Sequence, residues 1–357
     1  MQMKLAASSI CFLGFLLGFD PGAAAQATDP YQGLFVKSAD IALGDRTSRF
    51  DYESLDPETG RLFIAKMGAG QLVVFDVRSA TVIAQLDGFP KVTGVLAVPS
   101  LHRVYASAPG AGIGASLGVA LGMAGLSSGG GAIVAVDSLS LKQLARIPAG
   151  VFPDGIAYDP DDRRIFVSDE LGGAVTAIDA ESGKVLARIA AGGETGNVQY
   201  DPLTRKIYVP IQSRNELATI DPRMLRVTGR VPLAGANHPH GLHLAAAAAI
   251  GYVACDENDR LLVVDLKSGK VLQTLPLGHD PDVLAADPGF NRLYVASESG
   301  MLSVFDTADP AGLKKLGDVF AGTNAHSVAV DPASHRLYLP LPDLDAKAVM
   351  RVLTPVR

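Results

Sequence analysis

Residues 151–193 read VFPDGIAYDPDDRRIFVSDELGGAVTAIDAESGKVLARIAAGG and contain four short apolar runs separated by turn residues. The runs are rich in β-branched and apolar side chains and cover Gly155–Tyr158, Arg164–Ser168, Ala174–Ile178 and Lys184–Ala190. Asp-Pro, Gly-Gly and Ser-Gly pairs lie between the runs, and these residue types favour tight turns. The stretch predicts a four-stranded antiparallel meander, which needs neighbours of the same kind to bury both of its faces.

The same pattern recurs along the chain, and three independent markers keep one period. An aromatic residue in the second run recurs at Phe63, Tyr105, Phe166, Tyr208, Tyr252, Tyr294 and Tyr338. An aspartate that closes the third run recurs at Asp76, Asp137, Asp179, Asp221, Asp265 and Asp306. A glycine after the fourth run recurs at Gly44, Gly88, Gly150, Gly192, Gly235, Gly278 and Gly322. A period of about 42 residues with four strands per unit is typical of a β-propeller.

The number of aromatic markers predicts seven blades, and the last blade is incomplete in sequence order. Its unit supplies Ser327–Val330, Arg336–Leu339 and Val349–Leu353, and then the chain ends. The N-terminal run Ser38–Leu43 ends in Gly44, as every fourth strand does. We therefore expect an all-β fold: a seven-bladed β-propeller of four-stranded blades, with the last blade closed by the N-terminal strand. Closure removes the two free sheet edges that would otherwise promote aggregation.

Two stretches carry a resemblance to a known family. Residues 159–189, DPDDRRIFVSDELGGAVTAIDAESGKVLARI, and residues 287–306, DPGFNRLYVASESGMLSVFD, are similar to YVTN-type repeats. These repeats define the YncE-like seven-bladed propellers, so the resemblance implies this fold and an exported bacterial protein. The asparagine that ends the family motif is replaced in this chain by Lys66, Asp169, Cys255 and Ser297.

The first 25 residues have the pattern of a signal peptide. Lys4 supplies the positive end, Ile10–Phe19 is a short apolar core, and small residues near Ala25 suit cleavage. We expect residues 1–25 to be the signal peptide and residues 26–357 to be the propeller. This organisation predicts a periplasmic or secreted protein with no transmembrane span in the mature chain.

Composition excludes several classes of function. The chain has 357 residues and a formal net charge of −6, so no broad basic patch for nucleic acid is expected. Cys255 is the one cysteine outside the signal peptide, which excludes an internal disulfide. No Gly-x-Ser-x-Gly nucleophile elbow, phosphate-binding loop or Cys-x-x-Cys-His haem motif occurs. We expect a monomer with a protein or small-molecule ligand on its top face.

One segment exceeds the repeat. Ala108–Gly131 reads APGAGIGASLGVALGMAGLSSGGG and accounts for the 19 residues by which the second unit is longer. The segment connects the second and third strands of its blade, so we expect it on the face where the innermost strands begin. Two interpretations remain open: a flexible glycine-rich loop, or a lid or apolar contact surface over the channel mouth.

The start of each innermost strand supplies the candidate site. Stepping 12 residues back from each aromatic marker gives Asp51, Thr93, Asp154, Gly196, His240, Asp282 and His326. Five of these seven positions are Asp or His, and they should converge at the mouth of the central channel. We predict a ligand-binding set of Asp51, Asp154, His240, Asp282 and His326. His240, Asp282, His326 and Asp51 lie on consecutive blades and could bind a divalent metal ion as a cofactor.

Two functions from different classes fit this sequence. The first is an exported binding propeller that uses its top face and channel mouth to bind a ligand or partner, without catalysis. The second is a metal-dependent propeller enzyme of the lactonase or lyase type, with the His/Asp arc as its site. This second interpretation rests on fold-level analogy alone.

Overall fold

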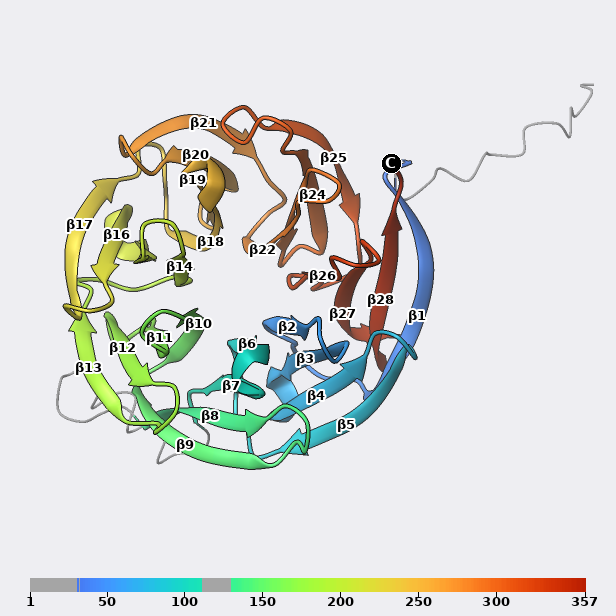
Figure 1. Ribbon diagram of the computed structural model, residues 1–357. Coiled ribbons are helices and arrows are strands. Elements are labelled where there is room, and N and C mark those ends of the chain that lie inside the picture. The colour runs from blue at the N-terminus through green and yellow to red at the C-terminus, as the bar shows by residue number, and fades with distance from the viewer. Residues whose placement is uncertain (1–30, 32, 111–129) are drawn as a thin grey trace, which may run out of the picture.

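The computed structural model describes residues 31, 33–110 and 130–357. These residues form a ring of seven four-stranded antiparallel sheets around a central channel (Figure 1). The predicted signal peptide and most of the predicted insertion lie outside the described residues. The all-β, seven-bladed fold predicted from the sequence is confirmed.

Each of the first three blades takes four consecutive strands, from the channel outwards. Blade 1 contains β2 (Glu53–Asp56), β3 (Arg61–Lys66), β4 (Gln71–Asp76) and β5 (Thr81–Asp87); blade 2 contains β6 (Val95–Val98), β7 (Arg103–Ala108), β8 (Gly131–Asp137) and β9 (Gln143–Gly150). Blade 3 contains β10 (Pro153–Asp159), β11 (Arg164–Asp169), β12 (Ala174–Asp179) and β13 (Val185–Ala190). The four strands of blade 3 are those predicted from residues 151–193.

The remaining blades follow the same plan. Blade 4 contains β14 (Gln199–Asp201), β15 (Lys206–Ile211), β16 (Glu216–Asp221) and β17 (Arg226–Pro232); blade 5 contains β18 (Pro239–Ala245), β19 (Ile250–Cys255), β20 (Arg260–Asp265) and β21 (Lys270–Pro276). Blade 6 contains β22 (Pro281–Asp287), β23 (Arg292–Ser297), β24 (Met301–Asp306) and β25 (Lys314–Phe320), and blade 7 contains β26 (Ala329–Val330), β27 (Leu337–Leu344), β28 (Lys347–Pro355) and β1 (Phe35–Asp45). Helical turns among the described residues are four 3-10 turns: η1 (Met67–Ala69), η2 (Pro99–Leu101), η3 (Gln212–Arg214) and η4 (Ala246–Ala248).

The aspartates that close the third strands form the turns that follow. The Asp179 carboxylate accepts the backbone N–H of Ser182 at 2.8 Å, and the Asp265 carboxylate accepts that of Lys267 at 2.8 Å. Such side-chain to backbone hydrogen bonds fix a tight turn within one repeat. Asp179 and Asp265 are therefore turn residues, and the repeat follows from local chemistry.

The core lies between neighbouring blades. The seven aromatic markers are at most 7% exposed, and each packs against the next blade around the ring. Phe63 of blade 1, for example, packs with Val104 and Val134 of blade 2, and Tyr338 of blade 7 packs with Phe75 of blade 1. Because every blade buries its faces on two neighbours, the ring is stable only as a whole.

Blade 7 joins the two ends of the chain. Strand β1 pairs antiparallel with β28, from Phe35 opposite Pro355 to Asp45 opposite Lys347, and Figure 1 shows β1 as the outer strand beside β28. Closure by the N-terminal strand is confirmed, although β1 is longer than the predicted Ser38–Leu43.

The other strands of blade 7 also differ in length from the prediction. Strand β26 is two residues long, whereas β27 and β28 extend into a hairpin beyond the predicted runs. Asp345 and Ala346 form its two-residue turn with φ of 52° and 64°, the left-handed geometry that suits the twist of a hairpin. Glycine is the residue most typical of such a turn, and the sequence has none at these positions. The longer hairpin was therefore not predicted.

The predicted insertion connects the strands that its position in the repeat indicated. Strand β7 ends at Ala108 and β8 begins at Gly131, so the segment joins the second and third strands of blade 2. Its two described ends lie on the face where the innermost strands begin, since the Ser107 hydroxyl donates to the backbone carbonyl of Asp154 at 2.6 Å. None of the helices found in residues 31, 33–110 and 130–357 is long and apolar enough to cross a membrane.

The closing strand offers a direct test of ring closure. Leu43 on β1 is fully buried, so Leu43→Ala should lower the free energy of unfolding by about 2–5 kcal/mol. Val36 on the same strand is 60% exposed, and Val36→Ala should change it by less than about 0.5 kcal/mol. Urea unfolding followed by circular dichroism measures both variants. Equal effects of the two substitutions would show that β1 is not part of the cooperative ring.

Candidate functional site

The innermost strands begin close together around the upper end of the channel. A Cβ atom added to Gly94 would lie 1.9 Å from the backbone carbonyl oxygen of Asp154, and one added to Gly241 would lie 2.3 Å from that of Asp282. Neighbouring backbones therefore touch at this level, and glycine is required where they do. This close approach brings the side chains at the strand starts towards one axis.

A cavity of about 350 Å³ lies at this upper end, and we name it the mouth cavity. Five of the seven predicted ring positions line it: Asp51, Thr93, Asp154, His240 and Asp282. Gly196 and His326 do not line the cavity, although the His326 ring lies beside Asp282. Four of the five predicted ligand-binding residues thus line the cavity, and the fifth, His326, lies beside it with its Nε2 3.9 Å from Oδ2 of Asp282. Their role in binding remains a prediction.

The loops between the second and third strands supply a further group of rim residues. The residue four positions after the aromatic marker is Met67, Glu170, Asp256 or Glu298 in blades 1, 3, 5 and 6, and all four line the mouth cavity. The equivalent residue of blade 4 is Gln212, which contacts His240. These side chains were not among the predicted site residues, although their constant offset from the aromatic marker is a signal in the sequence that identifies them.

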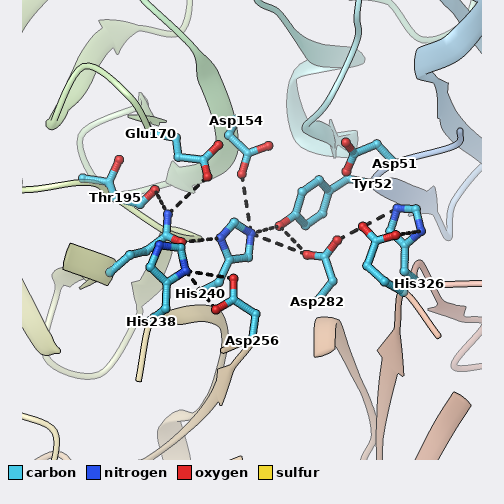
Figure 2. A network of polar contacts seen from close by, with 12 residues as sticks. Asp51, Tyr52, Asp154, Glu170, Thr195, His238, His240, Asp256, Asp282 and His326 are labelled. Atoms are coloured by element: carbon cyan, nitrogen blue, oxygen red, sulfur yellow. Dashed lines mark hydrogen bonds and ion pairs between the residues drawn. The ribbon is translucent and has the colours of Figure 1, made fainter. Parts of the chain in front are cut away.

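Tyr52 connects the two sides of the channel. Its hydroxyl lies 3.1 Å from Nε2 of His240 and 3.4 Å from Oδ1 of Asp282 (Figure 2). One hydroxyl proton cannot serve both partners, so the consistent arrangement has protonated Nε2 donating to Tyr52 and Tyr52 donating to Asp282. His240, Tyr52 and Asp282 then form one chain of hydrogen bonds from blade 5 through blade 1 to blade 6.

The second nitrogen of His240 is fixed by an amide. Gln212 Nε2 donates to the backbone carbonyl of Thr195 at 3.0 Å and to Glu170 at 3.3 Å, which leaves Gln212 Oε1 as an acceptor. Nδ1 of His240 therefore donates to Gln212 Oε1 at 3.3 Å. Both ring nitrogens of His240 are thereby placed as donors, which is the pattern of an imidazolium ion.

A second group of side chains gathers on the other side of Asp282. Ligand atoms of Asp51, Asp282 and His326 lie within 4.8 Å of one another, and these are three of the four predicted metal ligands. His240 is outside this group because its Nε2 faces Tyr52. Arg49, which the sequence analysis missed, lies 3.7 Å from Oδ2 of Asp51 and 3.6 Å from Oδ2 of Asp282, and it also pairs with Glu298.

The mouth cavity has more acidic groups than basic ones. Seven carboxylates line it, against the two basic side chains of Arg49 and His240. Burial raises the pKa of Asp51 to about 8, opposed by Arg49 and assisted by Asp154 and Asp282. Burial likewise raises the pKa of Asp154 to about 7, with Glu170 adding to the effect and His240 opposing it. The carboxylates therefore lack sufficient positive charge around them.

The same excess of negative charge raises the pKa of His240. Burial alone would lower the pKa of its imidazole, but the charges of Asp282, Glu170 and Asp154 outweigh burial and raise that pKa to about 9. This upward shift of the His240 pKa agrees with the hydrogen-bond pattern, in which both ring nitrogens donate. His240 is therefore a cation at neutral pH, held among carboxylates.

The other histidines near the mouth have separate environments. His238 pairs with Asp256 at 2.8 Å and with Glu194 at 3.5 Å at the rim. His279 pairs with Asp259 at 3.2 Å and its side chain is 81% exposed. His243 lies further down the channel, stacked on Tyr252 with 6.2 Å between ring centres. Neither His279 nor His243 lines the mouth cavity.

Comparison with known proteins supports the fold alone. No protein-family model and no curated protein matches this chain. Among solved structures, it is similar to the Kuenenia stuttgartiensis hydrazine synthase, with a TM-score of 0.68 and 16% sequence identity over 94% of this chain and 99% of that chain. A likeness at this identity indicates a shared propeller fold and carries no information on activity. The YVTN-repeat family therefore remains a resemblance.

The buried acids predict how stability depends on pH. Folding raises the pKa of Asp51 to about 8 and of Asp154 to about 7, so between pH 6.5 and 8 the folded state binds more protons than the unfolded state. The raised pKa of His240, about 9, acts in the same direction, because its stabilising effect is present below pH 6.5 and declines towards pH 9. We expect the melting temperature to fall as pH rises from 6.5 to 8.

Matched variants test whether residues of the mouth cavity cause this fall of the melting temperature with pH. Asp51→Asn removes one of the titrating groups, so its melting temperature should fall less steeply across this interval. Glu58→Gln changes an exposed carboxyl in the loop on the opposite face and should keep the wild-type slope. Differential scanning calorimetry in a pH series measures all three proteins. The same slope in wild type and Asp51→Asn would contradict the assignment.

Proposed function

We propose that this protein is an exported binding protein whose mouth cavity holds the positively charged group of a small organic ligand, without catalysis. One observation carries this proposal: seven carboxylates against two basic side chains line a cavity open at the top face. Asp154 is 4% exposed, and its Oδ2 has no hydrogen-bond partner among the described residues. The protonated Nε2 of His240 lies 3.9 Å from this oxygen, and a bound cation would add a counter-charge in direct contact with it.

The lining favours an organic cation over an inorganic one as the first candidate. The rings of Tyr52 and Phe152 and the thioether of Met67 line the same cavity as the carboxylates. An ammonium group gains from carboxylates and aromatic faces together, whereas a metal ion gains only from the carboxylates. Arg49 already shows that a nitrogen cation is accommodated between Asp51 and Asp282.

Butylammonium is a suitable probe of this proposal. At pH 8 it should bind with 1:1 stoichiometry in isothermal titration calorimetry, while butyrate, which has the opposite charge, should not bind. Asp154→Asn should weaken the affinity roughly tenfold or more, because a hydrogen bond to a charged group contributes about 1.5–3 kcal/mol. Affinity should also fall from pH 8 to 6, since Asp51 and Asp154 take up protons over this range.

Glu58→Gln is the matched control, because it removes a carboxylate that lies outside the mouth. It should bind butylammonium as the wild type does. If butylammonium does not bind the wild-type protein, the cation-binding proposal is wrong. Equal loss of affinity in Asp154→Asn and Glu58→Gln would place the binding elsewhere.

A specific observation favours a second candidate, the metal-dependent enzyme of the lactonase or lyase type. Nδ1 of His326 lies 3.2 Å from the backbone carbonyl of Asn324, and a carbonyl only accepts, so this nitrogen carries the proton. In the neutral ring Nε2 then has a free lone pair. His326 is 1% exposed, and its Nε2, which has no hydrogen-bond partner in the described chain, lies 3.9 Å from Asp282 Oδ2. Two carboxylates and such an imidazole suit Mn²⁺ or Zn²⁺.

Titration with Mn²⁺ and Zn²⁺ separates this candidate from the first. Binding of one ion per chain in chelator-treated protein, lost in His326→Ala, would support the metal site, and a lactone-hydrolysis assay of the loaded protein would follow. His279→Ala, which removes an imidazole with an 81% exposed side chain near the rim, should not alter metal affinity. If calorimetry shows no binding of either ion, the metal-dependent enzyme is excluded.

A further inference from the structure

A second and larger cavity continues the channel below the mouth. It has a volume of about 760 Å³, and we name it the lower chamber. It extends from Tyr52 to the Asp-Pro turns of the opposite face, where Pro57, Pro160, Pro202 and Pro332 line it. Its wall comes from the innermost strands and includes Val95, Ile156, Val198, Leu242, Leu284 and Val328. Most of this wall is aliphatic, unlike the wall of the mouth cavity.

The lower chamber has few titratable groups in its wall. Its lining contains one carboxyl group, that of Glu53, and one imidazole, that of His243. Burial lowers the pKa of His243 to about 4. The mouth cavity is lined by seven carboxyl groups, so the channel changes from a chamber rich in acidic groups to a largely apolar one.

Tyr52 separates the two chambers. It is the one residue shared by the two linings among the described residues. The other blades have smaller side chains at the equivalent position: Gly94, Gly155, Asn197, Gly241, Val283 and Ser327. Tyr52 is therefore the one aromatic residue at this position of the repeat, and its ring reaches across the channel (Figure 2). Its hydroxyl is held on the far side by His240, 3.1 Å away.

We propose that the ligand is an amphiphilic organic cation, whose ammonium head binds among Asp51, Asp154 and Asp282 and whose aliphatic tail enters the lower chamber when Tyr52 turns aside. This inference rests on the proposed function and specifies the chemistry of its ligand. Charge complementarity selects the head, and the largely aliphatic chamber on the other side of Tyr52 selects the tail.

The length of the tail gives a direct measurement. Each methylene group buried in an apolar chamber should increase affinity by about fourfold. Methylammonium, butylammonium and octylammonium are compared by calorimetry at pH 8, with octanoate as a ligand of equal tail and opposite charge. We expect affinity to rise steeply from methylammonium to octylammonium, and octanoate to bind at least tenfold more weakly than octylammonium.

Two variants locate the tail. Ala285 lines the lower chamber and is partly buried, so Ala285→Leu should reduce the affinity for octylammonium at least tenfold and leave that for methylammonium unchanged. Ala247→Leu, the same substitution at an exposed position on η4, should change neither affinity.

Tyr52→Ala should raise the ratio of octylammonium to methylammonium association rates in stopped-flow measurements, because the barrier between the chambers is removed.

The outcomes separate this inference from the proposed function. If all three ammonium ions bind wild-type protein with equal affinity, the cation-binding function stands and the tail in the lower chamber is excluded. If none of them binds, both proposals fail. The wild-type series decides the question even if Ala285→Leu does not fold. An undiminished chain-length dependence in folded Ala285→Leu would place the tail outside the lower chamber and overturn the inference.

Discussion

The pairing of β1 with β28 is the constraint on which the rest of this structure depends. It pairs Phe35 with Pro355, close to the two ends of the described chain, and so makes blade 7 complete. Only a closed ring brings Asp51 of blade 1 next to His326 of blade 7 and Asp282 of blade 6. Folding stability and the geometry of the mouth are therefore coupled, because a strand at the outer rim determines whether residues at the axis meet.

Sequence analysis predicted what local chemistry controls. Turn aspartates such as Asp179 bond within their own repeat, and the aromatic markers pack against the adjacent blade, so both recur at a fixed period. The ring of channel residues followed from the same period, which placed Asp154 and His240 at the mouth. The period also fixes the positions of Glu170 and Glu298, but these residues follow the second strands and are not at the strand starts from which the site was predicted.

The sequence did not predict contacts between distant blades, because these depend on the radius of the ring. Tyr52 meets His240 across the channel, although the two residues belong to blades 1 and 5. Arg49 lies outside every repeat marker, yet it pairs with Asp51, Asp282 and Glu298. His243 is three residues from His240 and lines the lower chamber, because the strand carries it further down the channel. Period alone does not distinguish these two imidazoles.

Function in this fold depends on departures from the repeat. Seven identical blades would give a channel with one kind of side chain at each level. Here the strand starts that line the mouth are of three kinds: Asp51, Asp154 and Asp282, then Thr93, then His240. One level below, Tyr52 stands where blades 2, 3 and 5 have glycine. The glycines let the backbones touch and set the channel width, and the one tyrosine then divides that channel. A symmetric scaffold thus becomes a two-chamber site through a change in one blade.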